Sequence, residues 1–307
     1  MLNRKIILDA DPGIDDAVAM AVLLKACKER VKLMVTTYGN MPAETTTRNA
    51  LRLLALLGAG EIPVARGADG PGPGNAVYED ASHIHGGDGI GGLQDSALFQ
   101  SLPERQAVGG DYLQLVYDAI MEEDNGVDYI ALGPMTNLSA LITRFPEVVK
   151  KLNQVIAMGG GIGLGNVTKY AEFNFYCDAE SARHVLSAAP DLVLAPINIT
   201  TQVAFGLEQI AAIGAAGTPA TRAMGAMLTL NYHQCVAYGE PGATMHDSVA
   251  VLAYLYPELF EFRACGIAID CERERYGEST VAEGSNVRLI TGTEPARLLE
   301  MIAKNLF

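Results

Sequence analysis

Short apolar runs alternate with longer stretches of helical periodicity along most of this chain. Residues 5–8 form an apolar run that stops at Asp9, a pattern typical of a buried parallel strand. The next stretch is rich in Ala, Val and Leu and ends in Lys and Arg, as expected of a helix that packs on a sheet. Repeated along the chain, this alternation predicts an α/β fold with right-handed βαβ units and an open, mostly parallel (mixed) sheet flanked by helices.

The individual elements can be placed from the same pattern. We expect strands at residues 5–8, 31–37, 62–65, 129–132, 155–158 and 192–197. We expect helices at residues 15–30, 45–57, 112–123, 135–145, 178–188 and 295–303, with helical patterns dominating 208–256. Residues 69–92 are rich in Gly and Pro and are expected to form a long loop, which is usually functional or disordered. No internal repeat or linker interrupts the pattern, so residues 1–307 are expected to form one domain.

Composition and charge narrow the range of partners. The chain has 307 residues, of which 49% are hydrophobic, enough to bury a large core. Its formal charge of -14 at pH 7 disfavours nucleic acid and anionic membrane surfaces as partners. We expect neither a membrane span nor a signal peptide, because no segment has roughly 20 consecutive apolar residues and the N-terminus lacks a long apolar stretch and a cleavage site. The five cysteines are scattered, which favours reduced thiols in a cytoplasmic protein.

Polar clusters follow several of the predicted strands. Ligands of open parallel sheets bind beyond the carboxyl ends of the strands, so these clusters are expected to meet at one site. They lie at residues 9–16, 39–40, 133–137, 159–174 and 198–200.

The most distinctive cluster is an acidic turn between the first strand and the first helix. Asp9, Asp11, Asp15 and Asp16 lie within eight residues, and the Pro-Gly pair at 12–13 folds the chain back on itself. A helix N-terminus stabilises a negative charge by roughly 0.3–1 kcal/mol. Two such charges about 4 Å apart repel by about 4 kcal/mol at an effective dielectric near 20. A hard divalent cation, calcium or magnesium, would resolve the conflict. The alternative is a capped helix with solvated carboxylates.

A second class of enzyme shares part of this motif. Phosphatases of the haloacid dehalogenase type carry Asp-x-Asp after their first strand, use Mg²⁺ and form an intermediate on the first aspartate. That class does not normally carry a Pro-Gly turn followed by a second pair such as Asp15 and Asp16. A third possibility is a protein that binds its ligand without catalysis.

A second polar segment suits a polyhydroxylated ligand. Residues 170–175 contain Glu172 and Asn174, and Asn166 precedes them. In an extended segment Glu172 and Asn174 would point to the same side, and a carboxylate with two amides offers the acceptors and donors that a sugar ring needs. Met158, next to a run of three glycines, can place an apolar surface against a sugar carbon, although such a residue is more often part of the core.

Taken together, these pieces resemble the inosine–uridine-preferring nucleoside hydrolase family. The matching segments are 9–17, 38–40, 85–86, 89–92, 132–134, 136–137, 158–160, 166, 172–174 and 246–247, in the order and spacing of the family. The resemblance implies a Rossmann-like nucleoside hydrolase fold and hydrolysis of the N-glycosidic bond of a ribonucleoside to ribose and free base. It also implies a small-molecule substrate, a Ca²⁺ cofactor and a homo-oligomer, either a tetramer or a dimer.

The resemblance further implies roles for individual residues. Asp11 would accept a proton from the attacking water, and His246 would protonate the departing base. The Ca²⁺ ligands would be Asp11, Asp15, Asp16, Asp247 and the backbone carbonyl of Leu132, where the family often has Thr. The substrate would be bound by Asn40, His85, Met158, Asn166, Glu172 and Asn174.

The chemistry is consistent with these assignments. Cleavage of an N-riboside passes through an oxocarbenium-like state, as glycoside hydrolysis does, and anionic groups around the sugar stabilise it. A cation with a neighbouring carboxylate can activate water. No covalent intermediate is needed, and no activated Ser or Cys is evident in the sequence.

Two details concern the base. Gln234 and Tyr238 precede His246 at the spacing found in family members that prefer pyrimidine nucleosides. An amide and a phenol can address the polar edge of uracil or cytosine, although this spacing also suits an ordinary helix surface. We therefore expect uridine and cytidine to be favoured over inosine. Ser248 stands where the family commonly has Pro, which is expected to shift the start of the following helix slightly.

Overall fold

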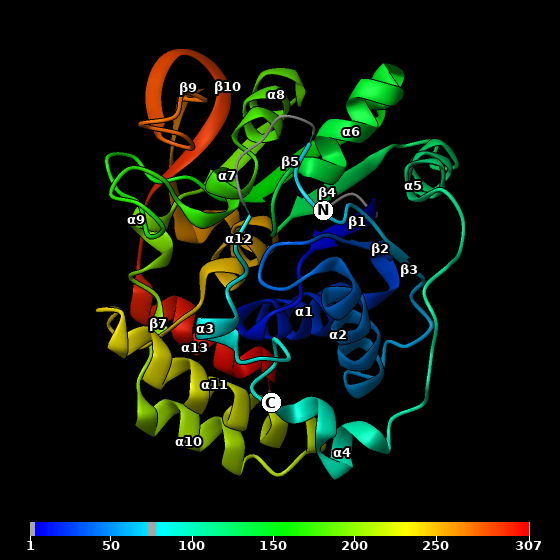
Figure 1. Ribbon diagram of the computed structural model, residues 1–307, viewed down its shortest axis with the longest axis vertical. Helices are drawn as coiled ribbons and strands as arrows, with labels where there is room; N and C mark the ends of the chain where they lie inside the picture. Colours follow the sequence, from blue (N-terminus) through cyan, green and yellow to red (C-terminus); the bar gives the residue numbers. More distant parts are fainter. Residues whose placement is uncertain (1–3, 73–77, 307) are drawn as a thin grey trace.

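A single eight-stranded sheet organises the fold (Figure 1). The computed structural model describes residues 4–72 and 78–306. The strand order is β3-β2-β1-β4-β5-β6-β10-β9, and all neighbouring strands are parallel except the antiparallel pair β9 and β10 at one edge. The expectation of an open, mostly parallel, mixed sheet flanked by helices is confirmed.

The strands agree with the sequence pattern, with bounds that differ by a few residues. The largest displacement is at the start of the strand expected at 155–158, which instead begins at Leu152. The strands are β1 Lys5–Ala10, β2 Val31–Thr36, β3 Val64–Arg66, β4 Val127–Ala131, β5 Leu152–Met158, β6 Leu192–Ala195, β9 Phe260–Ile269 and β10 Ser279–Thr293. A separate two-stranded sheet pairs β7 Ala204–Phe205 with β8 Ala243–Thr244.

The helices also follow the pattern, and four short ones lie among them. The helix expected at 15–30 ends at Cys27 and is followed by a 3-10 turn over Lys28–Arg30. The longer helices are α1 Ile14–Cys27, α2 Ala43–Leu56, α5 Tyr112–Met121, α6 Thr136–Arg144, α8 Ala179–Ala188, α10 Leu207–Ala215, α11 Pro219–Ala237, α12 His246–Leu255 and α13 Pro295–Leu306. The short helices are α3 Ser82–His85, α4 Ala97–Gln100, α7 Phe173–Cys177 and α9 Ile197–Thr200.

Two of the short helices correct the sequence analysis. Residues 69–92 are not a continuous loop, because α3 forms within them; part of this stretch, 73–77, lies outside the described residues. The segment expected to be extended at 170–175 turns into α7 at Phe173.

Each face of the sheet carries its own hydrophobic core. Side chains alternate between the faces along a strand, so Ile6 and Leu8 of β1 join one core while Ile7 joins the other. Helices α1, α2, α11, α12 and α13 contribute to the first core, and α5, α6 and α8 contribute to the second. Both faces are therefore covered, as a buried parallel sheet requires.

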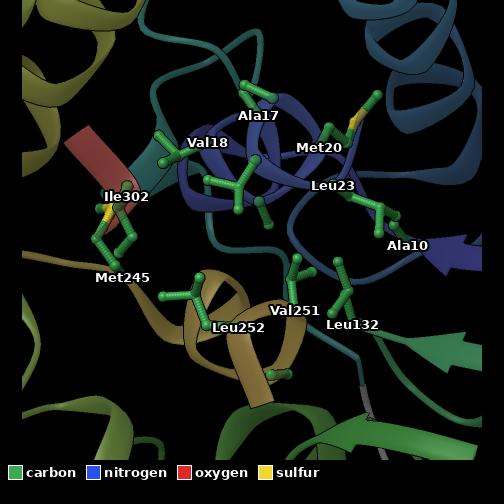
Figure 2. Close-up of a cluster of buried hydrophobic side chains, with 14 of the residues drawn as sticks. Ala10, Ala17, Val18, Met20, Leu23, Leu132, Met245, Val251, Leu252 and Ile302 are labelled. Carbon is green, nitrogen blue, oxygen red and sulfur yellow. The ribbon is translucent and has the colours of Figure 1, made fainter. Parts of the chain in front are cut away.

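The contact between α1 and α12 is central to the first core (Figure 2). Nearly every residue of both helices is buried. Figure 2 shows Val251 and Leu252 of α12 pointing toward α1, with Leu132 beside Val251 beyond the end of β4. Fully burying a side chain of this size contributes roughly 1.5–3 kcal/mol. The first residues of these two closely packed helices carry the acidic side chains described below.

Two smaller expectations can be compared with the structure. Across residues 4–72 and 78–306, no helix has both the length and the apolar character needed to span a membrane. All five cysteines are free thiols, in agreement with the sequence analysis, and four of them are buried.

Candidate active site

Hydrogen bonds join the polar segments that follow the parallel strands. The backbone N–H of Asn40, beyond β2, donates to Oδ2 of Asp11, beyond β1, at 2.7 Å. The side-chain amide of Asn174 donates to the carbonyl of Leu132, beyond β4, at 2.8 Å and to that of Met158, the last residue of β5, at 3.2 Å. The structure thus brings together the carboxyl ends of β1, β2, β4 and β5.

The acidic turn is shaped by hydrogen bonds to its own backbone. Helix α1 begins at Ile14, with Gly13 as the preceding cap residue. Oδ2 of Asp16 accepts the backbone N–H of Gly13 at 2.9 Å and the side-chain amide of Asn40 at 2.9 Å. The turn is therefore closed by one carboxylate of the helix that follows it, and Asn40 joins it to the end of β2.

Three carboxylates meet where α1 and α12 begin. Asp15, Asp16 and Asp247 are all buried, and each offers an oxygen that lies within 4.8 Å of the others. Oδ1 of Asp16 is buried and accepts no hydrogen bond from any described residue. An unpartnered buried carboxylate oxygen is costly, and a hard divalent cation with oxygen ligands would satisfy it. The residues present therefore fit a metal site.

The electrostatics of this group support the same conclusion. Burial, followed by repulsion from Asp16, raises the pKa of Asp15 to about 8. Burial, followed by repulsion from Asp16, raises the pKa of Asp11 well above its usual value, and burial, followed by repulsion from Asp15, does the same for Asp247. These carboxyl groups cannot all carry a negative charge without a compensating positive charge.

Asp9 is the exception in the acidic turn. Its Oδ2 accepts the hydroxyl of Tyr129 at 2.7 Å, and its Oδ1 accepts the side-chain amide of Asn137 at 2.9 Å. Burial raises its pKa to about 7, against the opposing effect of these two bonds. Both oxygens of Asp9 are thus engaged within the protein, and this carboxylate belongs to the support of the site.

Two glycines enclose the carboxylate of Asp11. A Cβ atom added to Gly39 would lie 1.9 Å from Oδ2 of Asp11, and one added to Gly133 would lie 2.5 Å from Oδ1. Backbone from beyond β2 and from beyond β4 therefore approaches the same side chain from both sides. This close approach explains why the segments after both strands carry glycine.

Glu172 and Asn174 are not arranged as the sequence analysis expected. Glu172 is the residue before α7, and its carboxylate accepts the backbone N–H of Asn174 at 2.9 Å and that of Gly160 at 2.7 Å. The two residues therefore do not lie together in one extended segment, because Glu172 caps a short helix and Asn174 lies inside it. Asn174 nevertheless contacts Leu132 and Met158, including Sδ of Met158 at 3.4 Å.

Asn166 lies in the exposed loop before α7. Its Oδ1 accepts the backbone N–H of Phe173, the first residue of that helix, at 2.9 Å. The structure therefore places Asn166 at the start of α7, and its side chain is exposed.

Two histidines lie close to the acidic group. Nδ1 of His246 is 2.7 Å from the hydroxyl of Thr200, and burial lowers the pKa of His246 to about 4. Nδ1 of His85 accepts the backbone N–H of Ile14 at 3.0 Å. Burial, followed by repulsion from His246, lowers the pKa of His85 to about 3. Both rings are therefore neutral near pH 7, and His85 supports the start of α1.

Gln234 and Tyr238 are more exposed than the acidic group. Gln234 is half-buried on α11, and Tyr238, just after that helix, is 64% exposed. The ring of Tyr238 meets that of His83 edge to face, with centroids 5.0 Å apart. This contact joins the end of α11 to α3, the helix that carries His85.

Sequence reasoning gave no role to several residues that contact the site, among them Thr200 and Tyr78. Thr200 lay in one of the polar clusters but was given no role, although it contacts His246. Tyr78 donates its hydroxyl to the carbonyl of Gly39 at 2.7 Å. Its position follows a Gly- and Pro-rich segment, and no spacing rule connects it with Gly39.

A group of buried carboxylates beyond the carboxyl ends of the strands of an open α/β sheet is typical of an enzyme that binds a metal ion. Comparison with known proteins shows the family to which the chain belongs. The sequence model described as "Inosine-uridine preferring nucleoside hydrolase" matches residues 6–300. The chain belongs to this family, whose members are enzymes that cleave N-glycosidic bonds.

Individual relatives agree with this assignment. The non-specific ribonucleoside hydrolase RihC of Klebsiella pneumoniae is 34% identical over 92% of this chain and 89% of its own length. The pyrimidine-specific ribonucleoside hydrolase RihA of Escherichia coli is 32% identical over 94% of this chain and 91% of its own length. A solved plant nucleoside hydrolase, PpNRh1, is 26% identical with a TM-score of 0.91 and covers 99% of both chains.

The enclosure of Asp11 can be tested with one added methyl group. The backbone of Gly133 does not require a positive φ, so Gly133→Ala acts mainly through the clash with Oδ1 of Asp11. Because a displacement of about 1 Å at a reacting group can cost roughly 100-fold, we expect kcat/KM for nucleoside hydrolysis to fall by about that factor. In the matched control Gly109→Ala the new Cβ meets nothing within 4 Å, and activity should be unchanged. Equal activity in the two variants would show that the close approach of Gly133 to the Asp11 carboxylate does not matter for hydrolysis.

Proposed function

We propose that this nucleoside hydrolase uses Ca²⁺ and prefers pyrimidine ribonucleosides, which it converts to ribose and free base. The observation that carries the metal-dependent part is the buried group of Asp15, Asp16 and Asp247, with one oxygen of Asp16 left without a partner. Asp11 is joined to this group by Asn40, which donates its backbone N–H to Asp11 and its side-chain amide to Asp16.

The cation would be held by oxygen atoms from two helices and two strand ends. We assign Asp15 and Asp16 of α1, Asp247 of α12, Asp11 and the Leu132 carbonyl as its ligands. When bound, Ca²⁺ supplies positive charge that neutralises these carboxylates, lowers the pKa of a water and orients the ribose diol. The Leu132 carbonyl also accepts a hydrogen bond from Asn174, and a carbonyl oxygen has a second lone pair for a further ligand.

Asp11 is assigned as the general base. One of its oxygens accepts the N–H of Asn40, and the carboxylate is enclosed between Gly39 and Gly133. A base held in one orientation can accept a proton from the attacking water without first reorganising. The attack breaks the bond between the anomeric carbon and the base nitrogen, and the electron pair leaves with the base.

The remaining polar residues are assigned to the sugar. Asn40, Asn166, Glu172 and Asn174 would orient the ribose hydroxyls, and Met158 would contact the ring from its apolar side. Glu172 already accepts three backbone N–H groups, which fixes its carboxylate in one orientation. Its negative charge, with that of Asp11, would stabilise the developing oxocarbenium ion.

His246 is assigned to the leaving group. Its Nδ1 is paired with Thr200, so its Nε2 is the nitrogen available to the base. His85 of α3 is assigned to the same part of the substrate-binding site. The base would extend toward Gln234 and Tyr238. The amide of Gln234 offers a donor and an acceptor to the polar edge of a pyrimidine, which is the basis for the proposed preference.

The first prediction of the proposed function concerns the reaction itself. With Ca²⁺ the wild-type protein should release free base and ribose from uridine, cytidine and inosine, as resolved by chromatography of the products. A chelator should abolish this release, and Asp11→Ala should lower kcat by roughly 10²- to 10⁴-fold because it removes the base. Asp124→Ala, at an exposed position before β4, is the matched control and should retain activity.

Two outcomes would contradict this reading. Phosphate release from ribose-5-phosphate with Mg²⁺, without base release from any nucleoside, would favour the haloacid-dehalogenase-like alternative. Binding of nucleoside without any product would instead favour a non-catalytic binder.

The second prediction concerns the cation and needs no substrate. Because a cation would relieve repulsion between buried carboxylates, Ca²⁺ at about 100 times its Kd should stabilise the fold by about 2.7 kcal/mol. This corresponds to a rise in Tm of roughly 5 °C for a chain of this size. Asp247→Asn should lose most of this rise, whereas the exposed Asp124→Asn should keep it. A larger rise with Mg²⁺ than with Ca²⁺ at the same concentration would argue against calcium.

The third prediction concerns the base. The wild-type kcat/KM should be higher for uridine and cytidine than for inosine. Gln234→Ala should lower kcat/KM for the pyrimidine nucleosides by roughly 3- to 10-fold, the value of one or two hydrogen bonds, and should change inosine less. His233→Ala, at the neighbouring exposed position of α11, serves as the control. A wild-type preference for inosine would show that the assignment of Gln234 is wrong.

A further inference from the structure

One peptide group stands between Tyr78 and Asp11. The hydroxyl of Tyr78 donates to the carbonyl oxygen of Gly39 at 2.7 Å. The N–H of the same peptide group, which belongs to Asn40, donates to Oδ2 of Asp11 at 2.7 Å. Hydroxyl, peptide and carboxylate therefore form one continuous hydrogen-bonded chain. Hydrogen bonds in such a chain polarise and strengthen one another.

The orientation of this peptide decides where the carboxylate of Asp11 can lie. Gly39 has a φ of 151°, which side-chain-bearing residues rarely adopt, and a Cβ there would come within 1.9 Å of Oδ2. On the other side, Gly133 approaches Oδ1. Rotation of the peptide between Gly39 and Asn40 would therefore either press Gly39 against the carboxylate of Asp11 or break the hydrogen bond that Asn40 donates to it.

Tyr78 is itself held by buried groups. Its ring meets that of Tyr38 edge to face, with centroids 4.9 Å apart and an interplanar angle of 82°. Tyr38 is fully buried, and its hydroxyl pairs with that of Thr136 at 3.0 Å. Burial, followed by the nearby charge of Asp11, raises the pKa of Tyr78, so its hydroxyl stays protonated and acts as the donor.

We propose that Tyr78 is a positioning residue for Asp11, which it acts on through the peptide between Gly39 and Asn40. The inference rests on the proposed role of Asp11 as general base. Tyr78 is assigned no contact with substrate, because its hydroxyl is already bonded to Gly39. The effect of the hydroxyl should therefore appear in the chemical step and not in the binding of the nucleoside.

The test removes only the hydroxyl, in Tyr78→Phe, which leaves the ring in contact with Tyr38. We expect kcat to fall by roughly 3- to 10-fold, as the loss of one neutral hydrogen bond allows, with KM unchanged within about twofold. A merely structural disturbance of this segment would be expected to raise KM, because His85 follows in the same segment. Tyr256→Phe, which removes a hydroxyl at the far end of α12, is the matched control and should leave both constants unchanged.

A second readout is independent of activity and is taken for every variant at the same Ca²⁺ concentration. The amide proton of Asn40 should resonate far downfield in a ¹H–¹⁵N spectrum of the wild-type protein, because its bond to a carboxylate is short. In Tyr78→Phe this resonance should move upfield, and in Tyr256→Phe it should not move. Thermal unfolding of each variant would establish that the fold is retained.

The outcomes separate this inference from the proposed function. If kcat of Tyr78→Phe equals that of the wild type, or only KM changes, the positioning role is wrong whatever the spectrum shows. An unmoved Asn40 resonance would likewise overturn it. If Asp11→Ala instead keeps full activity, the proposed base is wrong, although the Asn40 resonance could still respond to Tyr78→Phe.

Discussion

The apolar packing of α1 against α12 is the interaction on which the site depends. Both helices are buried along most of their length and both carry aspartate in the first turn, so their packing forces Asp15, Asp16 and Asp247 together. Two such charges about 4 Å apart repel by about 4 kcal/mol, whereas each fully buried apolar side chain contributes roughly 1.5–3 kcal/mol. Several buried side chains in this contact outweigh the repulsion (Figure 2). The fold thereby holds a cluster of negative charge that a divalent cation can complete.

The carboxylates of the acidic turn differ in the hydrogen-bond partners of their oxygens. Asp9 has both oxygens bonded to side chains, and Asp11 has one oxygen fixed by the N–H of Asn40. Asp16 has one oxygen bonded twice and the other buried without a hydrogen bond. Because a carboxylate oxygen without a hydrogen bond is the most available to a cation, these differences separate a supporting aspartate from those able to act as ligands. The sequence contains four similar residues in one turn, and their distinct environments come from the backbone of the turn and from Tyr129 of β4, Asn137 of α6 and Asn40 beyond β2.

The fold and the acidic turn were predictable from sequence because both depend on local patterns. Apolar alternation located the strands, and the Pro-Gly turn placed Asp11 near Asp15 within a few residues. The extended reading of Glu172 failed because a helix cap looks extended for one residue, and the helix after it is only five residues long. Asp247 lies far along the chain, so only the family resemblance could associate it with the turn. Thr200 and Tyr78 were missed because their contacts depend on the path of connecting segments, which no periodicity describes.

The contacts of the acidic turn also explain why the segment around α3 is ordered beside it. A tight turn between a strand and a helix leaves backbone groups without partners in either element. Here residues that are distant in sequence form hydrogen bonds with those groups. Asn49 of α2 donates to the carbonyl of Pro12, and His85 accepts the N–H of Ile14. The same amide of Asn49 also donates to the carbonyl of Asp88, within the segment that carries His85. The described part of this segment is therefore a structural component of the acidic turn, and its displacement would leave buried backbone groups of the site unpaired.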